Sequence, residues 1–291
     1  MAVAGIVCRV SGPAVALETT LLAHGVPRER SLELFDALER DVRGAGATPA
    51  LIGVLHGLPI VGMSRADLIE LMADPVCPKL NTANLGITLH RRSSGATTVS
   101  TTMELAAAAG VRVFATGGIG GVHRGYGERL DISADLAALA RFPVAVVASG
   151  VKSILDVEST REALETLGVP VVGYRTDVFP AFYLRASGAR VDARFDDAAD
   201  LGRFVESEMR RTGRGVLIAN PIPEADEIHP DRWHAWMAEA ERAAAGAEGR
   251  DATPALLAAL HRVSGGATLA ANIALVRSNA RLAGAVRMAM G

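Results

Sequence analysis

Lysine occurs at only two positions, Lys79 and Lys152, although the chain carries 30 basic residues. Arginine stays protonated near neutral pH, whereas a lysine removed from water can lose its proton and act as a nucleophile. Lys152 follows an apolar stretch, at the expected start of a helix, where the helix dipole and desolvation both favour the free amine. Such an amine attacks an aldehyde carbon to form a Schiff base. The alternative is a solvated lysine at a helix start, which fits poorly in a chain that otherwise uses arginine.

Glu18 is the second residue whose position indicates chemistry, because it closes an apolar strand predicted over residues 14–17. Partial burial would raise the pKa of its carboxyl group and suit it to general acid–base work near neutral pH. A salt bridge to a neighbouring arginine explains the same placement equally well.

A glycine-rich segment over residues 116–121 precedes a polar segment over 123–135. Glycine N–H groups can bind a phosphate, but a tight structural turn is an equal alternative, because no helix follows as in the dinucleotide fingerprint. Asp131 and Asp135 offer carboxylates without zinc-type spacing, which indicates a hard cation such as Mg²⁺ or Mn²⁺. Spacing alone favours helix capping, with Ser133 as the N-cap and Asp135 in the first turn.

The elements that must position these residues follow from apolar runs and their breakers. Strands are predicted over residues 14–17, 49–55, 59–63, 111–115, 144–148, 169–173 and 216–219. Helices are predicted over residues 27–43, 98–109, 153–167, 179–186, 196–211, 233–245, 254–263 and 268–290, with a short one after Ser64, and residues 74–94 are predicted to be irregular. The alternation predicts an α/β fold with a largely parallel sheet covered on both faces. No linker interrupts the chain, so a single domain over 1–291 is expected.

This fold class also predicts where the polar residues meet. Ligands of a parallel α/β sheet bind beyond the carboxyl ends of the strands. Four polar positions each follow a predicted strand: Glu18, residues 116–121, residues 149–152 and Asn220. We therefore expect them to converge at one edge of the sheet.

The composition narrows the function classes. A formal net charge of −2 argues against a nucleic-acid binder, and 49% apolar residues suffice for a sizeable core. No apolar run approaches the length of a membrane span, and the N-terminus lacks the charged leader of a signal peptide. Two cysteines, Cys8 and Cys77, make no disulfide framework. We therefore expect a cytoplasmic protein without nucleic-acid or membrane partners.

Taken together, the motifs resemble the pseudouridine-5′-phosphate glycosidase family, also called indigoidine-synthase-A-like. The resemblance runs in order over nearly the whole chain. It is carried by Ala-Leu-Glu-Thr-Thr at 16–20, His24-Gly25, Ala-Thr-Gly-Gly-Ile-Gly-Gly-Val-His-Arg-Gly at 115–125, Asp-Ile-Ser-Ala-Asp-Leu at 131–136, Ser-Gly-Val-Lys-Ser-Ile-Leu-Asp at 149–156, Gly173-Tyr174, Phe-Pro-Ala-Phe-Tyr at 179–183, Ala-Asn-Pro-Ile-Pro at 219–223 and Leu-Ala-Ala-Asn-Ile-Ala-Leu-Val at 269–276.

The resemblance implies a three-layer α/β/α domain that assembles as a homotrimer. It also implies reversible cleavage of the C–C glycosidic bond of pseudouridine 5′-phosphate to uracil and ribose 5-phosphate. The family's nucleophilic lysine falls on Lys152, its acid–base glutamate on Glu18 and its divalent-metal carboxylate, usually for Mn²⁺, on Asp131. The implied substrate contacts are Lys79, Val99, Thr116, His123, Ser133, Ala134, Asp135 and Asn272.

Two segments depart from the family's pattern. Leu80–Leu85 replaces the usual Ser-Arg-Arg-Asp-Leu-like stretch, and Gly125-Tyr126-Gly127 replaces the usual Gly-Ala-Glu. Both departures leave the residues that bind the sugar phosphate unchanged, but they can change which aglycone binds opposite the sugar phosphate. The alternative activity is therefore a C-glycosynthase that joins ribose 5-phosphate to a non-uracil aromatic acceptor in natural-product biosynthesis. A dinucleotide-dependent oxidoreductase, a pyridoxal-phosphate enzyme and a non-catalytic sugar-phosphate sensor agree less well with the motifs.

Overall fold

The computed structural model describes residues 5–128, 130–245 and 252–291. In this part of the chain, 11 strands form one sheet with the order β1-β4-β3-β2-β7-β8-β11-β9-β10, and the short β5 and β6 join it at the side of β3. The strands are Val7–Cys8 (β1), Ala14–Glu18 (β2), Thr48–Leu55 (β3), Leu58–Val61 (β4), Lys79–Leu80 (β5), Gly95–Thr97 (β6), Val113–Ala115 (β7), Ala145–Ala148 (β8), Val171–Tyr174 (β9), Ala193–Phe195 (β10) and Val216–Ala219 (β11).

The sheet is mixed but mostly parallel. β3 pairs antiparallel with β4 and with β6, while the pairs along the rest of the sheet are parallel. The central strands β2, β7, β8 and β11 are buried along their whole length, as expected of strands covered on both faces. This confirms the predicted α/β class.

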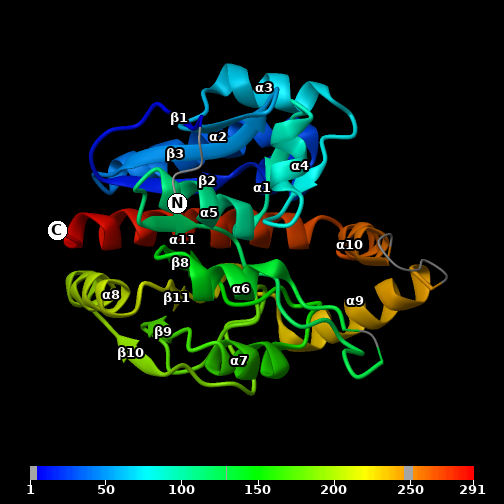
Figure 1. Ribbon diagram of the computed structural model, residues 1–291. Coiled ribbons are helices and arrows are strands. Elements are labelled where there is room, and N and C mark those ends of the chain that lie inside the picture. Colours follow the sequence, from blue (N-terminus) through cyan, green and yellow to red (C-terminus); the bar gives the residue numbers. More distant parts are fainter. Residues whose placement is uncertain (1–4, 129, 246–251) are drawn as a thin grey trace.

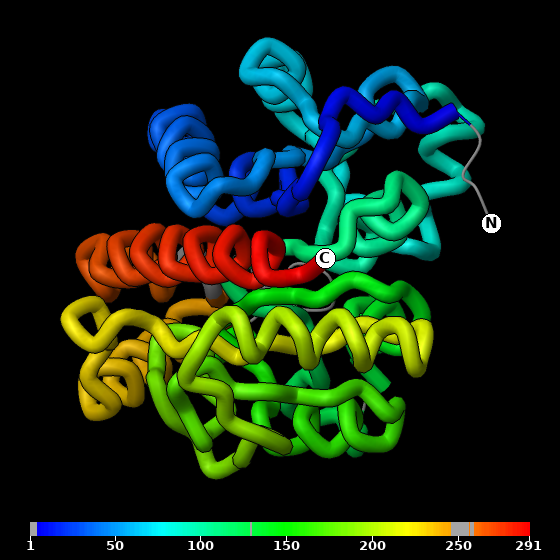
Figure 2. Tube along the Cα trace, turned by 90° about the vertical axis from the view of Figure 1, so that its left-hand side faces the viewer, coloured from blue at the N-terminus to red at the C-terminus, as the bar shows by residue number. Residues whose placement is uncertain are grey.

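Helices cover the two faces of the sheet (Figure 1). They are Thr19–His24 (α1), Arg28–Gly44 (α2), Arg65–Ala73 (α3), Leu85–His90 (α4), Val99–Ala108 (α5), Ala134–Arg141 (α6), Val157–Thr166 (α7), Ala198–Thr212 (α8), Pro230–Ala243 (α9), Ala252–Val263 (α10) and Ala267–Ala289 (α11). α11 crosses the middle of the molecule and packs against α2, α8 and the strands β2, β7 and β8. Figure 2 shows α11 and α2 together on one side of the sheet and α5 on the other.

Local sequence signals placed several elements correctly. The predicted strands 49–55 and 59–63 correspond to β3 and β4, which form a hairpin; its two turn residues, His56 and Gly57, both have positive φ, as a type I′ turn requires. Ser64 caps α3 with a complete capping box to Asp67. Among the described residues, no helix combines the length and the apolar character needed to cross a bilayer.

Three predictions of local secondary structure were wrong. Residues 74–94 are not irregular, because β5 and α4 form there despite the prolines and asparagines. The helix predicted from Ser153 begins at Val157, because Asp156 is the N-cap and the Ser153 hydroxyl instead donates to the Ala181 carbonyl. Residues 179–186 are not helical: Phe182 has a φ of 59°, and its N–H donates to the Ser149 carbonyl.

Candidate active site

The carboxyl ends of β2 and β7 bring Glu18 and Thr116 together. Glu18 is the last residue of β2 and only 7% exposed, and Thr116 directly follows the neighbouring strand β7. The Thr116 hydroxyl donates a hydrogen bond to Oε1 of Glu18. Because the two strands are parallel neighbours, their ends lie at the same edge, as predicted.

The carboxyl group of Glu18 is tuned towards neutral pH. Burial raises its pKa to about 7, and the charge of Asp135 acts in the same direction. The charge of Lys152, the hydrogen bond from Thr116 and the charge of Lys79 act in the opposite direction. A carboxyl group with a pKa near the working pH can both donate and accept a proton, which is the property of a general acid–base residue. Among the residues that the structure describes, no arginine contributes to this shift, so the salt-bridge alternative is not supported.

Lys152 reaches this edge from the segment that follows β8. The backbone of this segment pairs with the glycine-rich segment: the Ile119 N–H donates to the Gly150 carbonyl at 3.0 Å, and the Lys152 N–H donates to the Ile119 carbonyl at 3.2 Å. Lys152 itself is exposed, and it lies in a turn ahead of α7 instead of at a helix start. Both arguments for its reactivity, the helix dipole and desolvation, are therefore wrong. Its proximity to Glu18 is the feature that remains.

Lys79 approaches the same edge from β5. Burial and the positive charge of Lys152 lower the pKa of Lys79, and the charge of Glu18 raises it. β5 pairs with β6, which leads directly into α5, and the Thr98 hydroxyl donates to the Leu80 carbonyl at 2.8 Å. Lys79 is thus held next to the first turn of α5.

The first turn of α5 offers N–H groups to an anion. Val99 is its first residue, and the first N–H groups of a helix find no acceptor within the helix. The Ser100 N–H is bound by Oδ1 of Asp135 at 3.0 Å. The hydroxyl of Thr101 is buried and has no hydrogen-bond partner among the described residues. This turn, together with Lys79, is suited to bind a phosphate.

The glycine-rich segment packs so closely against its neighbours that a side chain would not fit at two of its glycines. An ideal Cβ on Gly118 would lie 2.5 Å from the Phe182 ring, and one on Gly120 would lie 2.3 Å from the Ser133 hydroxyl oxygen. The N–H of Gly120 already donates to Asp135, and that of Ile119 to a backbone carbonyl. The structure thus favours the tight-turn alternative over a phosphate cradle.

Asp135 connects the first turn of α5 to the glycine-rich segment. Ser133 is the N-cap of α6, Ala134 is the first residue of that helix, and Asp135 follows in its first turn, as predicted. The carboxylate of Asp135 is 5% exposed and accepts hydrogen bonds from Ser100 and Gly120, the latter at 2.8 Å. Asp135 therefore fixes α5 to the glycine-rich segment and adds a negative charge near Glu18.

Asp131 is the residue that can hold a cation. Its side chain is 66% exposed, and Oδ2 lies 3.7 Å from Nδ1 of His123. Within the described residues, no three His, Cys, Asp or Glu side chains gather as a metal cluster. One exposed carboxylate fits a hard cation that keeps most of its water ligands, such as Mn²⁺ or Mg²⁺. A site enclosed by protein ligands does not fit this donor set.

Asn272 enters the site from α11. Its Nδ2 donates to the Gly25 carbonyl at 3.1 Å, while its Oδ1 is buried without a partner in the described part of the chain. An ideal Cβ on Gly117 would lie 3.4 Å from this Oδ1. The structure thus leaves a free acceptor beside the glycine-rich segment.

Asn279 is a residue that the sequence reasoning missed. It lies two helical turns beyond Asn272 on the same face of α11, is fully buried, and binds the backbone of Thr116 and Gly117. The seven-residue spacing of two asparagines on an otherwise apolar helix face was the available signal.

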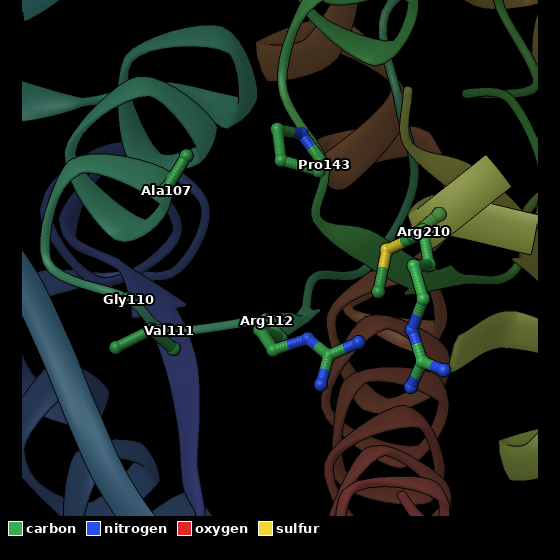
Figure 3. A pocket seen from close by; sticks show the side chains of 7 residues that line it. Ala107, Gly110, Val111, Arg112, Pro143 and Arg210 are labelled. Atoms are coloured by element: carbon green, nitrogen blue, oxygen red, sulfur yellow. The ribbon is translucent and has the colours of Figure 1, made fainter. Parts of the chain in front are cut away.

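A cavity of about 340 Å³ lies away from these residues (Figure 3). It is lined by Ala107, Gly110, Val111, Arg112, Pro143, Met209 and Arg210. Arg112 and Pro143 precede β7 and β8, so the cavity opens at the edge opposite Glu18. Arg112 and Arg210 each pair with Glu206 at 3.2 Å. The cavity is therefore separate from the candidate site.

The sequence is similar to a known family and to named proteins. The family model for indigoidine synthase A like protein matches residues 7–289. A pseudouridine-5′-phosphate glycosidase from Nocardioides sp. is 47% identical over 96% of this chain and 92% of its own, and one from Deinococcus radiodurans is 49% identical over 94% and 88%.

Two solved structures are also similar. An indigoidine synthase A-like protein from Thermotoga maritima has a TM-score of 0.89 and 38% identity over 97% of this chain and 95% of its own. The prealnumycin C-glycosynthase AlnA, in complex with ribulose 5-phosphate, has a TM-score of 0.90 and 38% identity over 98% and 97%.

Proposed function

The chain belongs to the indigoidine synthase A-like family, and from that premise we propose that it reversibly cleaves pseudouridine 5′-phosphate to uracil and ribose 5-phosphate. The observation that carries the proposal is the buried Glu18, with a pKa near 7, within the field of the Lys152 amine. The relatives named pseudouridine-5′-phosphate glycosidase match over nearly the whole chain, which supports this substrate.

The bond to be broken explains why an acid and an amine are needed together. A C–C glycoside has no leaving oxygen to protonate, so a pair of carboxylates is insufficient. Glu18 gives its proton to the ring oxygen as the C1′–O bond breaks, and the free amine of Lys152 bonds to C1′.

The second stage uses the same nitrogen. The nitrogen first gives a proton to the Glu18 carboxylate; its electron pair then forms the C1′=N bond of a Schiff base while the C1′–C5 bond breaks and C5 of uracil takes that proton from Glu18. Water then hydrolyses the Schiff base, which releases ribose 5-phosphate and restores the amine.

The phosphate gives the enzyme a group by which to hold the opened sugar. In our proposal it lies at the first turn of α5, where the N–H groups of Val99 and Thr101 and the charge of Lys79 converge. His123, Ser133, Ala134 and Asn272 line the rest of the sugar site. Anchoring the phosphate keeps C1′ near Lys152 after the ring opens, when the chain would otherwise rotate freely.

Asp131 would hold a divalent cation, for which Mn²⁺ is our proposal. The bound ion would supply positive charge and ordered water close to the sugar phosphate. His123 lies beside Asp131, with its Nδ1 3.7 Å from the carboxylate. We also propose a homotrimer in the cytoplasm, where the free thiols of Cys8 and Cys77 would stay reduced.

A second candidate is a C-glycosynthase that takes an aromatic acceptor in place of uracil. The likeness to AlnA supports it, as do the unusual residues beside the site. In segment 81–84, Asn84 donates through Nδ2 to the Lys79 carbonyl, and its Oδ1 accepts from the Asn81 N–H. The altered loop adjoins Lys79, and in this candidate it would change which acceptor binds while the Lys79 side chain still binds the phosphate.

One assay separates the two candidates. The protein is mixed with Mn²⁺, ribose 5-phosphate and uracil, and pseudouridine 5′-phosphate is sought by mass spectrometry. We expect product from the wild-type protein and none from Lys152→Ala or Glu18→Gln. Borohydride should trap ribose 5-phosphate on Lys152. Trapping without product would move the assignment to the C-glycosynthase with another acceptor. Absence of both would remove the sugar-amine chemistry altogether.

A further inference from the structure

Asn279 is a fully buried amide on the face of α11 that lies under the strand ends of the site. Its neighbours on that face are apolar, including Leu275, Val276 and Ala280. A polar side chain in such surroundings is tolerated only when its hydrogen bonds are made. The partners of Asn279 therefore indicate why an amide is present.

These partners come from three strands. The two hydrogens on Nδ2 of Asn279 are shared among three acceptors, the Thr116 carbonyl at 2.8 Å, the Gly117 carbonyl at 3.3 Å and the Ser149 hydroxyl at 3.2 Å. Oδ1 accepts from Nδ2 of Asn220 at 2.9 Å. Thr116 follows β7, Ser149 follows β8 and Asn220 follows β11. One side chain thus connects the carboxyl ends of three adjacent parallel strands.

The β8 end carries one reacting group, and the β7 end contacts the other, which lies on β2. Thr116 donates its hydroxyl hydrogen to Glu18, and Ser149 begins the segment that ends at Lys152. The Gly117 carbonyl also accepts from the Ser149 N–H at 2.9 Å, so the two ends meet directly above Asn279. A shift of the β8 end would change the separation of Glu18 and Lys152, and a shift of the β7 end would disturb the hydrogen bond from Thr116 to Glu18.

We propose that Asn279 is a positioning residue, which holds the ends of β7 and β8 so that Glu18 and Lys152 act on the two atoms of the same C1′–O bond. The proposal rests on the proposed function, because it assigns those two side chains to one reaction. An amide is required at this position, because it must donate to two carbonyls and accept from Asn220 at the same time.

The docking of α11 does not depend on this amide. Arg277 on the same helix pairs with Asp41 of α2 at 2.7 Å, and Leu282 and Val286 are buried farther along. Loss of the amide should therefore disturb the strand ends more than the packing of the helix.

The test compares Asn279→Leu with Val286→Ala, a matched loss of buried contact at the far end of α11. Both are expected to lower Tm. We expect kcat for pseudouridine 5′-phosphate cleavage to fall roughly 10²-fold in Asn279→Leu only, with a small change in KM, because misplacement by about 1 Å costs that much in rate. Asn220→Ala, which removes the partner of Oδ1, should act in the same direction and more weakly.

A second readout does not require activity. The carboxyl of Glu18 is titrated by ¹³C NMR, with Glu18→Gln to assign its signal. The Lys152 charge and the Thr116 hydrogen bond both lower the pKa of Glu18, so displacement of either strand end should raise this pKa in Asn279→Leu, and the pKa should stay unchanged in Val286→Ala. Equal behaviour of the two variants in rate and titration would overturn the proposal. If wild-type protein does not cleave pseudouridine 5′-phosphate, the proposed function fails, while the titration still decides the role of Asn279.

Discussion

The hydroxyl of Thr116 donates to the buried carboxylate of Glu18 across the neighbouring strands β7 and β2. This contact is one of three that lower the pKa of Glu18 against the larger effect of burial. The balance between them places the carboxyl group near neutrality, where it can move a proton in both directions of a reversible reaction.

Stability should depend on pH through Glu18. Its pKa is about 7 in the folded protein against an ordinary value of 4.5, so between these values the folded state keeps a proton that the unfolded state loses. The free energy of unfolding should therefore fall by roughly 3 kcal/mol as the pH rises through this range. Urea unfolding at several pH values measures it. Glu18→Gln should remove this fall, and the exposed Glu162→Gln should keep it; a fall that persists in Glu18→Gln contradicts the assignment.

Thr116→Val should raise the pKa of Glu18, because a hydrogen bond that favours the carboxylate is lost. If protonated Glu18 opens the sugar ring, the alkaline limb of the pH–rate profile should move to higher pH. Thr116→Ser keeps the hydroxyl and should retain a profile close to wild type. Identical profiles for the two variants would show that the hydroxyl does not tune Glu18.

Asp135→Asn should act on both stability and pH dependence. An asparagine cannot accept from both Ser100 and Gly120 without turning its NH₂ group towards one of the two N–H donors. We expect a loss of roughly 1–3 kcal/mol in urea unfolding. The pKa of Glu18 should fall, because a neighbouring negative charge is removed. Asp156→Asn is the control, since asparagine caps a helix as well as aspartate.

Lys79→Gln should weaken substrate binding through the phosphate. A charged hydrogen bond contributes about 1.5–3 kcal/mol, so KM for pseudouridine 5′-phosphate should rise roughly tenfold or more. Lys79→Arg keeps the charge and should lose less. The exposed Arg91→Gln at the end of α4 controls for a general charge effect. A normal KM in Lys79→Gln would place the phosphate elsewhere.

Gly118→Ala should lower the stability of the protein, because the added methyl group would clash with a neighbouring side chain. The new Cβ would lie 2.5 Å from the ring of Phe182, whose backbone is already in the left-handed region. We expect lower Tm and lower activity. Gly86→Ala in α4 meets no atom within 4 Å and should be neutral or stabilising by about 0.5–1 kcal/mol. Equal Tm values for the two variants would contradict the packing argument.

Sequence motifs determined the class, the family and the candidate residues of this protein. Apolar runs bounded by glycine and polar residues predicted the central strands, and the strand ends predicted where Glu18 and the segment around Lys152 meet, because parallel strands share one edge. The family match agrees with the resemblance read from the motifs. The metal, the trimer and the Schiff base stay predictions.

Only the tertiary structure decided how these residues are tuned. The pKa of Glu18 depends on burial and on side chains from four distant segments, which no local pattern contains. The start of α7 and the turn at Phe182 were mispredicted because Ser153 and Phe182 bind backbone groups far away in the sequence, and such contacts outweigh local preference. Asn279 was missed for the same reason: its role lies in three strand ends that meet only in the folded chain.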